Sequence, residues 1–234
     1  MRRRDDFVLG MLLGASLLVP WSNAVSAHNP GTYFSPLVFW DNHQDIDYKI
    51  DDSIPGTNGS AFEDRISDGA GAWNAVTGVN GFTFDDMGNS STNWADPCTW
   101  ENSAAVDIRV FYRDLAVPGV SLLCVRYDSQ IGAYYSTAGR MGFNDDNSVT
   151  WYTGTGNVPA GEVSVEEVAL HELGHLTGTF YNGAYEGHWQ PEPSFACALG
   201  GAESDFTMCP LVTPGKSYLL PLDAHDIDTF QNAY

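Results

Sequence analysis

Residues 164–176, which read SVEEVALHELGHL, decide how the rest of the chain is interpreted. Ser164 and Glu167 form the capping box that begins a helix, and apolar residues follow at helical spacing. His175 follows His171 by four positions. On a helix both imidazoles therefore lie on one face, close enough to hold one Zn²⁺. The stretch therefore predicts a zinc site built on a helix.

Glu172 follows the first of these histidines and completes an H-E-x-x-H pattern. A catalytic zinc site takes three protein ligands and keeps one position open for water, whose pKa falls toward about 7 on the metal. A glutamate beside that water can take its proton as the oxygen attacks a carbonyl, and can then pass the proton to the leaving amine. We therefore expect His171 and His175 to be zinc ligands and Glu172 to be the general base.

Around this helix the patterns predict a sheet and two further helices. A helix begins at Ser60, where Ser60 and Glu63 form another capping box, and runs to Val76, although Gly69 and Gly71 weaken it. A last helix begins at Asp223. Strands are expected at Asp45–Asp51, Gly81–Asp85, Val106–Arg113, Leu122–Tyr127, Arg140–Asn144 and Val149–Tyr152. The serine- and asparagine-rich stretch from Asp85 to Val106 is expected to be loop. Together these elements predict a single α+β domain.

The first 27 residues have the pattern of a signal peptide. Three arginines, Arg2 to Arg4, precede the short apolar run Phe7–Pro20, and Val25-Ser26-Ala27 offers small residues for cleavage. The run is shorter than the roughly 20 apolar residues of a membrane span. We therefore predict a secreted mature domain of residues 28–234, extracellular or periplasmic if the host has two membranes, with no membrane association after cleavage.

Charge and cysteine content narrow the class of protein. The net charge of −20 argues against nucleic acid as a partner. In an oxidising compartment the four cysteines predict two disulfides, and we favour Cys98–Cys124 and Cys197–Cys209 among the three possible pairings. Structural Ca²⁺ is a further candidate ligand, with acidic loops at Asp51-Asp52, Asp85-Asp86 and residues 144–147. We expect a monomer.

The zinc helix and the segments after it resemble the matrixin group of metzincin metallopeptidases. His171-Glu172-x-x-His175-x-x-Gly178 is similar to the start of the long metzincin motif H-E-x-x-H-x-x-G-x-x-H. Residues 206–210 resemble the Met-turn, with Met208 as its methionine, and residues 222–227 resemble the segment that opens the terminal helix of matrixins. The resemblance implies a metzincin-like domain with a twisted mixed sheet, a central zinc helix and a C-terminal helix.

The third ligand is where the chain departs from this family. The family's third histidine would fall at Tyr181, and a phenol of pKa about 10 is a poor ligand. His188, at the end of a glycine-containing loop, is our first choice, because neutral imidazole suits zinc. Tyr181 and Glu186 stay as alternatives, as does a site with no third ligand.

These observations favour a secreted zinc endopeptidase that acts on protein or peptide substrates. An edge strand should hold the substrate in extended form, and Val106–Arg113 and Leu122–Tyr127 are the two candidates. The alternative is a non-catalytic binding protein on a metzincin scaffold, which would have lost full zinc coordination at Tyr181. A zinc-dependent hydrolase of a non-peptide amide is a third reading. No propeptide with an inhibitory cysteine fits the sequence between the leader and His43.

Overall fold

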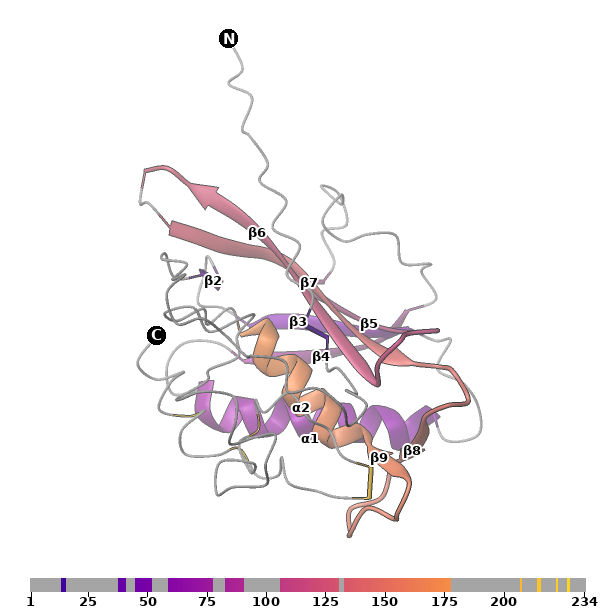
Figure 1. Cartoon of the computed structure of the whole chain (residues 1–234). Coiled ribbons are helices and arrows are strands. Elements are labelled where there is room, and N and C mark those ends of the chain that lie inside the picture. Colours follow the sequence, from indigo (N-terminus) through magenta and orange to yellow (C-terminus); the bar gives the residue numbers. More distant parts are fainter. Residues whose placement is uncertain are drawn as a thin grey trace.

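A mixed sheet covered on one face by two helices forms the body of the protein (Figure 1). The computed structural model describes residues 14–15, 38–40, 45–51, 59–77, 83–90, 106–130 and 133–177, with Thr207, Pro214, Gly215, Leu222 and Ile227. The strands of the main sheet are β1 (Gly14–Ala15), β2 (Val38–Trp40), β3 (Ile46–Asp51), β4 (Phe84–Ser90), β5 (Ile108–Arg113), β6 (Gly119–Asp128) and β7 (Ala133–Asn144). The helices are α1 (Gly59–Thr77) and α2 (Val165–Leu176), and β8 (Thr150–Tyr152) pairs with β9 (Glu162–Ser164).

The strand order of the main sheet is β1-β6-β7-β5-β3-β4. Strand β2 is not part of this order and pairs with β7. The pairs β2–β7, β5–β7, β3–β5 and β3–β4 are parallel, whereas β6 runs antiparallel to β7 in a long hairpin. Apart from the two residues of β1, which pair with Val120 and Ser121, β6 is the outermost described strand on its side. Strand β5 is internal, so of the two candidate edge strands the structure makes β6 the edge.

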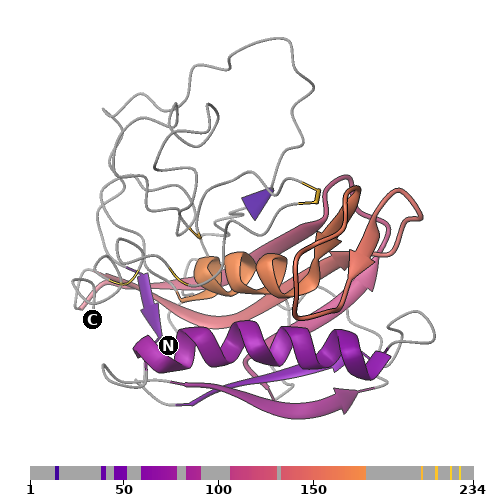
Figure 2. The ribbon, with the colours of Figure 1, turned by 90° about the horizontal axis from the view of Figure 1, so that it is seen from below.

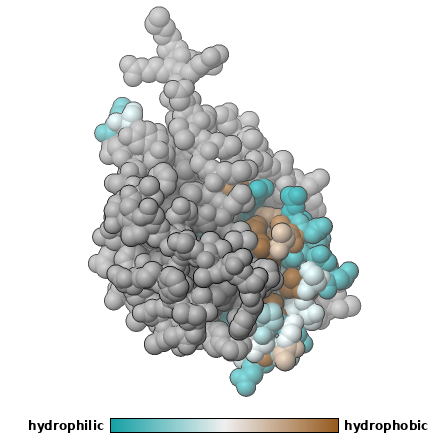
Figure 3. All heavy atoms as spheres, in the orientation of Figure 1, coloured by the Kyte–Doolittle hydropathy of each residue, from teal (hydrophilic) through white to brown (hydrophobic). Residues whose placement is uncertain are grey.

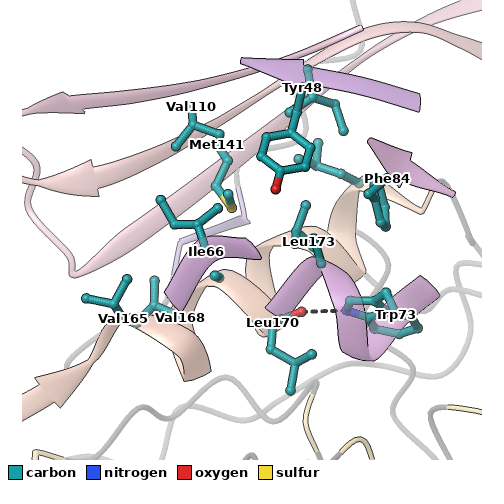
Figure 4. Packing of buried hydrophobic residues seen from close by; sticks show 14 of the residues in the cluster. Tyr48, Ile66, Trp73, Phe84, Val110, Met141, Val165, Val168, Leu170 and Leu173 are labelled. Carbon is teal, nitrogen blue, oxygen red and sulfur yellow. Dashed lines mark hydrogen bonds between the residues drawn. The ribbon is translucent and has the colours of Figure 1, made fainter. Parts of the chain in front are cut away.

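Alternation along the strands supplies one half of the hydrophobic core. In β3, Ile46, Tyr48 and Ile50 are buried and the residues between them are partly exposed. This two-residue period directs one face of the sheet toward the helices. Side chains from β5 and β7 join the same cluster, among them Val110 and Met141 (Figure 4).

The two helices supply the other half of the core and lie against each other (Figure 2). They approach most closely at Gly69, where a Cβ would lie 3.1 Å from both the Cβ of Ala169 and the backbone nitrogen of Leu170. One turn later the indole Nε1–H of Trp73 donates to the carbonyl of Leu170 at 2.8 Å (Figure 4). Gly69, one of the two glycines that weaken the helical pattern, therefore allows α2 to pack closely against α1.

Most of the predicted elements are confirmed, and the differences lie at their ends. The strands at Asp45–Asp51, Val106–Arg113 and Val149–Tyr152 and both described helices are found where the patterns place them. The prediction of loop after Asp85 is wrong for its first five residues, because β4 continues to Ser90. The hairpin strands β6 and β7 are longer than predicted, because they pair with each other from Gly119 and Phe143 to Asp128 and Ala133, with one register shift after Cys124. Helix α1 begins at Gly59, one residue before the predicted cap, and Glu63 accepts a hydrogen bond from Asn89 on β4.

The C-terminal part of the chain is described at only a few positions. Ile227, which falls in the predicted last helix, is helical and packs against the core, and Leu222 is buried within it. The remainder of that predicted helix lies outside the described residues.

The described surface is largely polar. Figure 3 shows hydrophilic residues beside a smaller apolar area on the described part of one face. Among the described residues, Met87 is the large apolar side chain that stands out as exposed. No helix formed by these residues is long and apolar enough to cross a membrane. The α+β class is thus confirmed, and the prediction of one domain over residues 28–234 stays a prediction.

Candidate metal centre

Helix α2 carries the candidate site, and its start is fixed by the predicted cap. Ser164 has extended backbone angles and its side chain accepts a hydrogen bond from the backbone N–H of Glu167. Glu166 and Glu167 in the first turn are favourably placed in the field of the helix N-terminus. At the other end, the hydroxyl of Thr177 donates to the carbonyl of Gly174, and the indole of Trp40 donates to the carbonyl of Leu176. The helix is therefore held at both ends.

The two histidines of α2 face each other. Their Nε2 atoms are 3.1 Å apart, and the rings meet edge to face with centroids 4.8 Å apart. Two nitrogens that are both ligands of one tetrahedral zinc lie about 3.3 Å apart, since each Zn–N bond is about 2.0–2.1 Å. The spacing of His171 and His175 therefore fits two ligands of a common metal ion.

A backbone carbonyl fixes the proton on His171. Nδ1 of this ring lies 3.0 Å from the carbonyl oxygen of Thr207, which can only accept. Nδ1 must therefore carry the hydrogen, and the neutral ring keeps its lone pair on Nε2, the atom that faces His175. Burial lowers the pKa of His171 to about 4, and the bond to Thr207 opposes this in part. The ring is neutral at pH 7, as a metal ligand must be.

Glu172 packs against the edge strand β6. Its Oε2 accepts a hydrogen bond of 2.7 Å from the hydroxyl of Ser121. A Cβ at Gly119 would lie 2.9 Å from its Oε1 and 2.5 Å from Cγ1 of Val168, so only glycine permits this approach. Glu172 and His171 are 1% exposed and His175 is 5% exposed, so the whole motif is buried. The carboxylate is thus held by β6 while the imidazoles face each other.

The structure brings together only part of the predicted site. His171, Glu172 and His175 are adjacent as predicted, whereas His188, Tyr181, Glu186 and Met208 lie outside the described residues. Thr207, which immediately precedes Met208, is fully buried and touches the first histidine. Within the described ranges no group of three or more His, Cys, Asp or Glu side chains is close enough to hold a metal ion. The third ligand stays a prediction.

The structure describes part of the candidate calcium loops. Several side chains in these loops accept hydrogen bonds from other groups of the protein. Asn144 exchanges hydrogen bonds with the backbone of Leu115, and Asp146 accepts from the backbone N–H of Ser148. Asp86 accepts from Ser67 and from the backbone N–H of Gly88. Calcium at these loops stays a prediction.

Cys124 lies on β6, is buried, and is disulfide-bonded. The other three cysteines, Cys98, Cys197 and Cys209, lie outside the described residues, so the structure does not identify which of them is its partner. The pairings Cys98–Cys124 and Cys197–Cys209 therefore remain predictions.

Sequence patterns did not identify Ser121, Gly119 or Thr207 as parts of the site. Each reaches α2 from a distant part of the chain, Ser121 across 51 residues and Thr207 across 36. Their contacts depend on the register of β6 and on the path of the chain after α2. Neither the register nor the path can be predicted from the spacing of nearby residues in the sequence.

Comparison with known proteins identifies no relative: no protein-family model matches this chain, and no curated protein sequence matches it.

Proposed function

We propose that this protein is a secreted zinc-dependent endopeptidase of matrixin-like type. The observation that carries the proposal is the pair of Nε2 atoms of His171 and His175, 3.1 Å apart on one turn of α2 beside Glu172. In the metal-free protein the same two atoms are within hydrogen-bond distance, and Nε2–H of His175 can donate to the Nε2 lone pair of His171. The convergence supports a shared metal ion.

His171 and His175 would hold the zinc, with His188 as the proposed third ligand and Tyr181 as the alternative. When bound, zinc supplies Lewis-acid activation of a water molecule and of the substrate carbonyl. The Thr207 carbonyl keeps the proton of His171 on Nδ1, so the Nε2 lone pair would be available as a zinc ligand. Glu172 takes the proton of the attacking water and delivers it to the leaving amine. Met208 would form the turn beneath the site.

Strand β6 is the proposed substrate-binding edge. Its residues Val120 and Ser121 pair with the extended, antiparallel β1, which shows that this edge accepts a second strand. Glu172 lies against the helix-facing side of the same strand, at Gly119 and Ser121. An extended peptide bound to this edge by main-chain hydrogen bonds would therefore run along the strand that contacts the general base. Strand β1 belongs to the proposed leader, so its removal would free this edge.

The burial of the motif gives weight to a second function. A site whose two histidines and glutamate are buried, and whose zinc coordination is incomplete, would not turn over a substrate. A non-catalytic binding protein built on this scaffold would show that behaviour. The two functions differ in what Glu172 does, and the experiment is built on that difference.

The test measures zinc content and cleavage of casein or gelatin by the purified mature protein and by Glu172→Ala. Stoichiometric zinc in both proteins, with cleavage lost only in the variant, supports the endopeptidase. Absence of zinc supports the binding protein, whereas zinc without cleavage of any protein supports a hydrolase of non-peptide amides. A protein that cleaves equally well with Glu172→Ala would refute the proposal.

The same measurement tests the ligands. His171→Ala and His175→Ala should each abolish stable zinc binding, and metal retention by either would reject the helix site. His188→Ala should weaken zinc binding far more than Tyr181→Phe. The reverse order would assign the third ligand to Tyr181.

A further inference from the structure

We propose that Ser121 is a positioning residue that holds the carboxylate of Glu172 in its working orientation, with Gly119 providing the space for it. This inference rests on the proposed function, because it assigns a partner to the proposed general base. It adds a residue of the edge strand, distant in sequence, to the turn of α2 that carries the motif.

The register of β6 directs both residues at the helix. Gly119 pairs with Phe143 and Ser121 with Met141, and both of these β7 side chains are fully buried in the core between sheet and helices. Directly paired residues point to the same face of a sheet, so Gly119 and Ser121 face α2. Val120, between them, points to the other face.

The contact between Ser121 and Glu172 has the geometry of a strong hydrogen bond. The Oγ–H donates to Oε2 at 2.7 Å, within the range of bonds to an ionised oxygen. Both side chains are buried, with Ser121 at 2% exposure. In such surroundings a donor to a carboxylate is worth more than at a surface. The hydroxyl therefore fixes Oε2 at Ser121 and restricts rotation of the carboxylate plane.

Orientation of the base matters because proton transfer requires close and aligned contact with the water. A glutamate side chain has several rotatable bonds, and without a fixed donor it samples more than one carboxylate orientation. Loss of the hydroxyl should therefore lower kcat, since fewer bound complexes have the base in place. Substrate binding through the main chain of β6 should change little.

The experiment compares Ser121→Ala and Ser121→Thr with the unaltered protein. Ser121→Ala should lower kcat by about 10- to 100-fold, the loss typical when the partner of a site residue is removed, with KM changed less than about twofold. Zinc content should not change. Ser121→Thr keeps the hydroxyl and should recover most of the kcat.

Ser136→Ala is the matched control. Ser136 is a buried serine of the neighbouring strand β7, and its hydroxyl has no hydrogen-bond partner among the described residues. Removing it tests whether loss of any buried hydroxyl in this sheet affects turnover. It should leave kcat and KM unchanged.

Crystal structures of the three proteins give a readout independent of activity. The carboxylate of Glu172 should have one orientation in the unaltered protein and in Ser121→Thr, and several in Ser121→Ala. An unaltered kcat and a single orientation in Ser121→Ala would overturn the inference while leaving a Glu172-dependent peptidase intact. A loss shared equally by Ser136→Ala, or one not restored by Ser121→Thr, would also overturn it. If the unaltered protein cleaves nothing, the proposed function fails first and the inference fails with it.

Discussion

One backbone carbonyl, that of Thr207, determines which nitrogen of His171 carries the proton and which keeps its lone pair. We predict that in the metal-free protein His171 is protonated at Nδ1 and bare at Nε2. Long-range proton–nitrogen NMR of labelled protein distinguishes the two tautomers directly. A signal from protonated Nε2 and bare Nδ1 would contradict the contact with Thr207 and remove one support of the zinc proposal.

Tyr48 gives a prediction for alkaline pH. Burial, together with the negative charges of Asp86 and Asp85, raises the pKa of this phenol to about 12, against the opposing bond to Ser67. The unfolded chain loses the proton near pH 10, so the stabilising effect is complete below pH 10 and is lost as the pH rises toward 12. Urea denaturation between about pH 9 and about pH 11.5 should show falling stability, with a shallower slope in Tyr48→Phe.

A remaining slope in Tyr48→Phe is expected from Tyr112. Burial also raises the pKa of this phenol, and the charge of Asp145 adds to the effect. Equal slopes in Tyr48→Phe and the unaltered protein would show that Tyr48 is not protected from ionisation.

The two motif histidines and their glutamate were predictable from sequence because their spacing is local to one helix. Ser121 and Gly119 were not, because they meet Glu172 only after β6 pairs with β7 and the sheet packs on α2. A serine or glycine within a strand pattern carries no sign of what it will face. The supporting residues of the site therefore became visible only in three dimensions.

At the level of elements, α1 contains two glycines with opposite roles. Gly69 lies where α1 meets α2, and an added Cβ would be 3.1 Å from backbone as well as side chain of α2. Gly71 is exposed, with no atom within 4 Å of an added Cβ. We predict that Gly69→Ala destabilises the protein by about 1–3 kcal/mol through overpacking. Gly71→Ala should stabilise it by about 0.5–1 kcal/mol through helix propensity.

Denaturant unfolding of the two alanine variants measures both effects against the same reference. Because the substitution is identical, intrinsic helix propensity cancels and the difference reports the contact between the helices. Stabilisation by Gly69→Ala equal to that by Gly71→Ala would mean that α2 does not pack closely at that point.

Element types were more predictable than element ends. Alternation in β3 and capping at Ser164 are local signals, and both are confirmed. The continuation of β4 to Ser90 and the length of the β6–β7 hairpin depend on partners elsewhere in the chain. Polar residues such as Asp86 and Asn89 join β4 because β3 and α1 provide hydrogen-bond partners, among them Ser67 and Glu63.

For the whole molecule, the charge of −20 is the dominant electrostatic property. Uncompensated negative charge destabilises a compact state through self-repulsion, and salt screens this repulsion. We predict that Tm rises when NaCl is increased from about 0.01 M to about 0.15 M, a range over which the screening length falls from about 30 to about 8 Å. A matched concentration of a neutral osmolyte controls for solvent effects. A fall in Tm would show that attractive charge pairs outweigh the repulsion.

Two tryptophans mark the ends of the segment that bears both histidines. Trp73 and Trp40 direct their indole N–H groups at the carbonyls of Leu170 and Leu176, one just before His171 and the other just after His175. Both rings are buried, so these protons should exchange slowly with deuterated solvent. The molecule thus contains a natural pair of spectroscopic markers. If binding of a divalent ion displaces the helix, the NMR signals of these two indole protons should shift, and this can be measured without an activity assay.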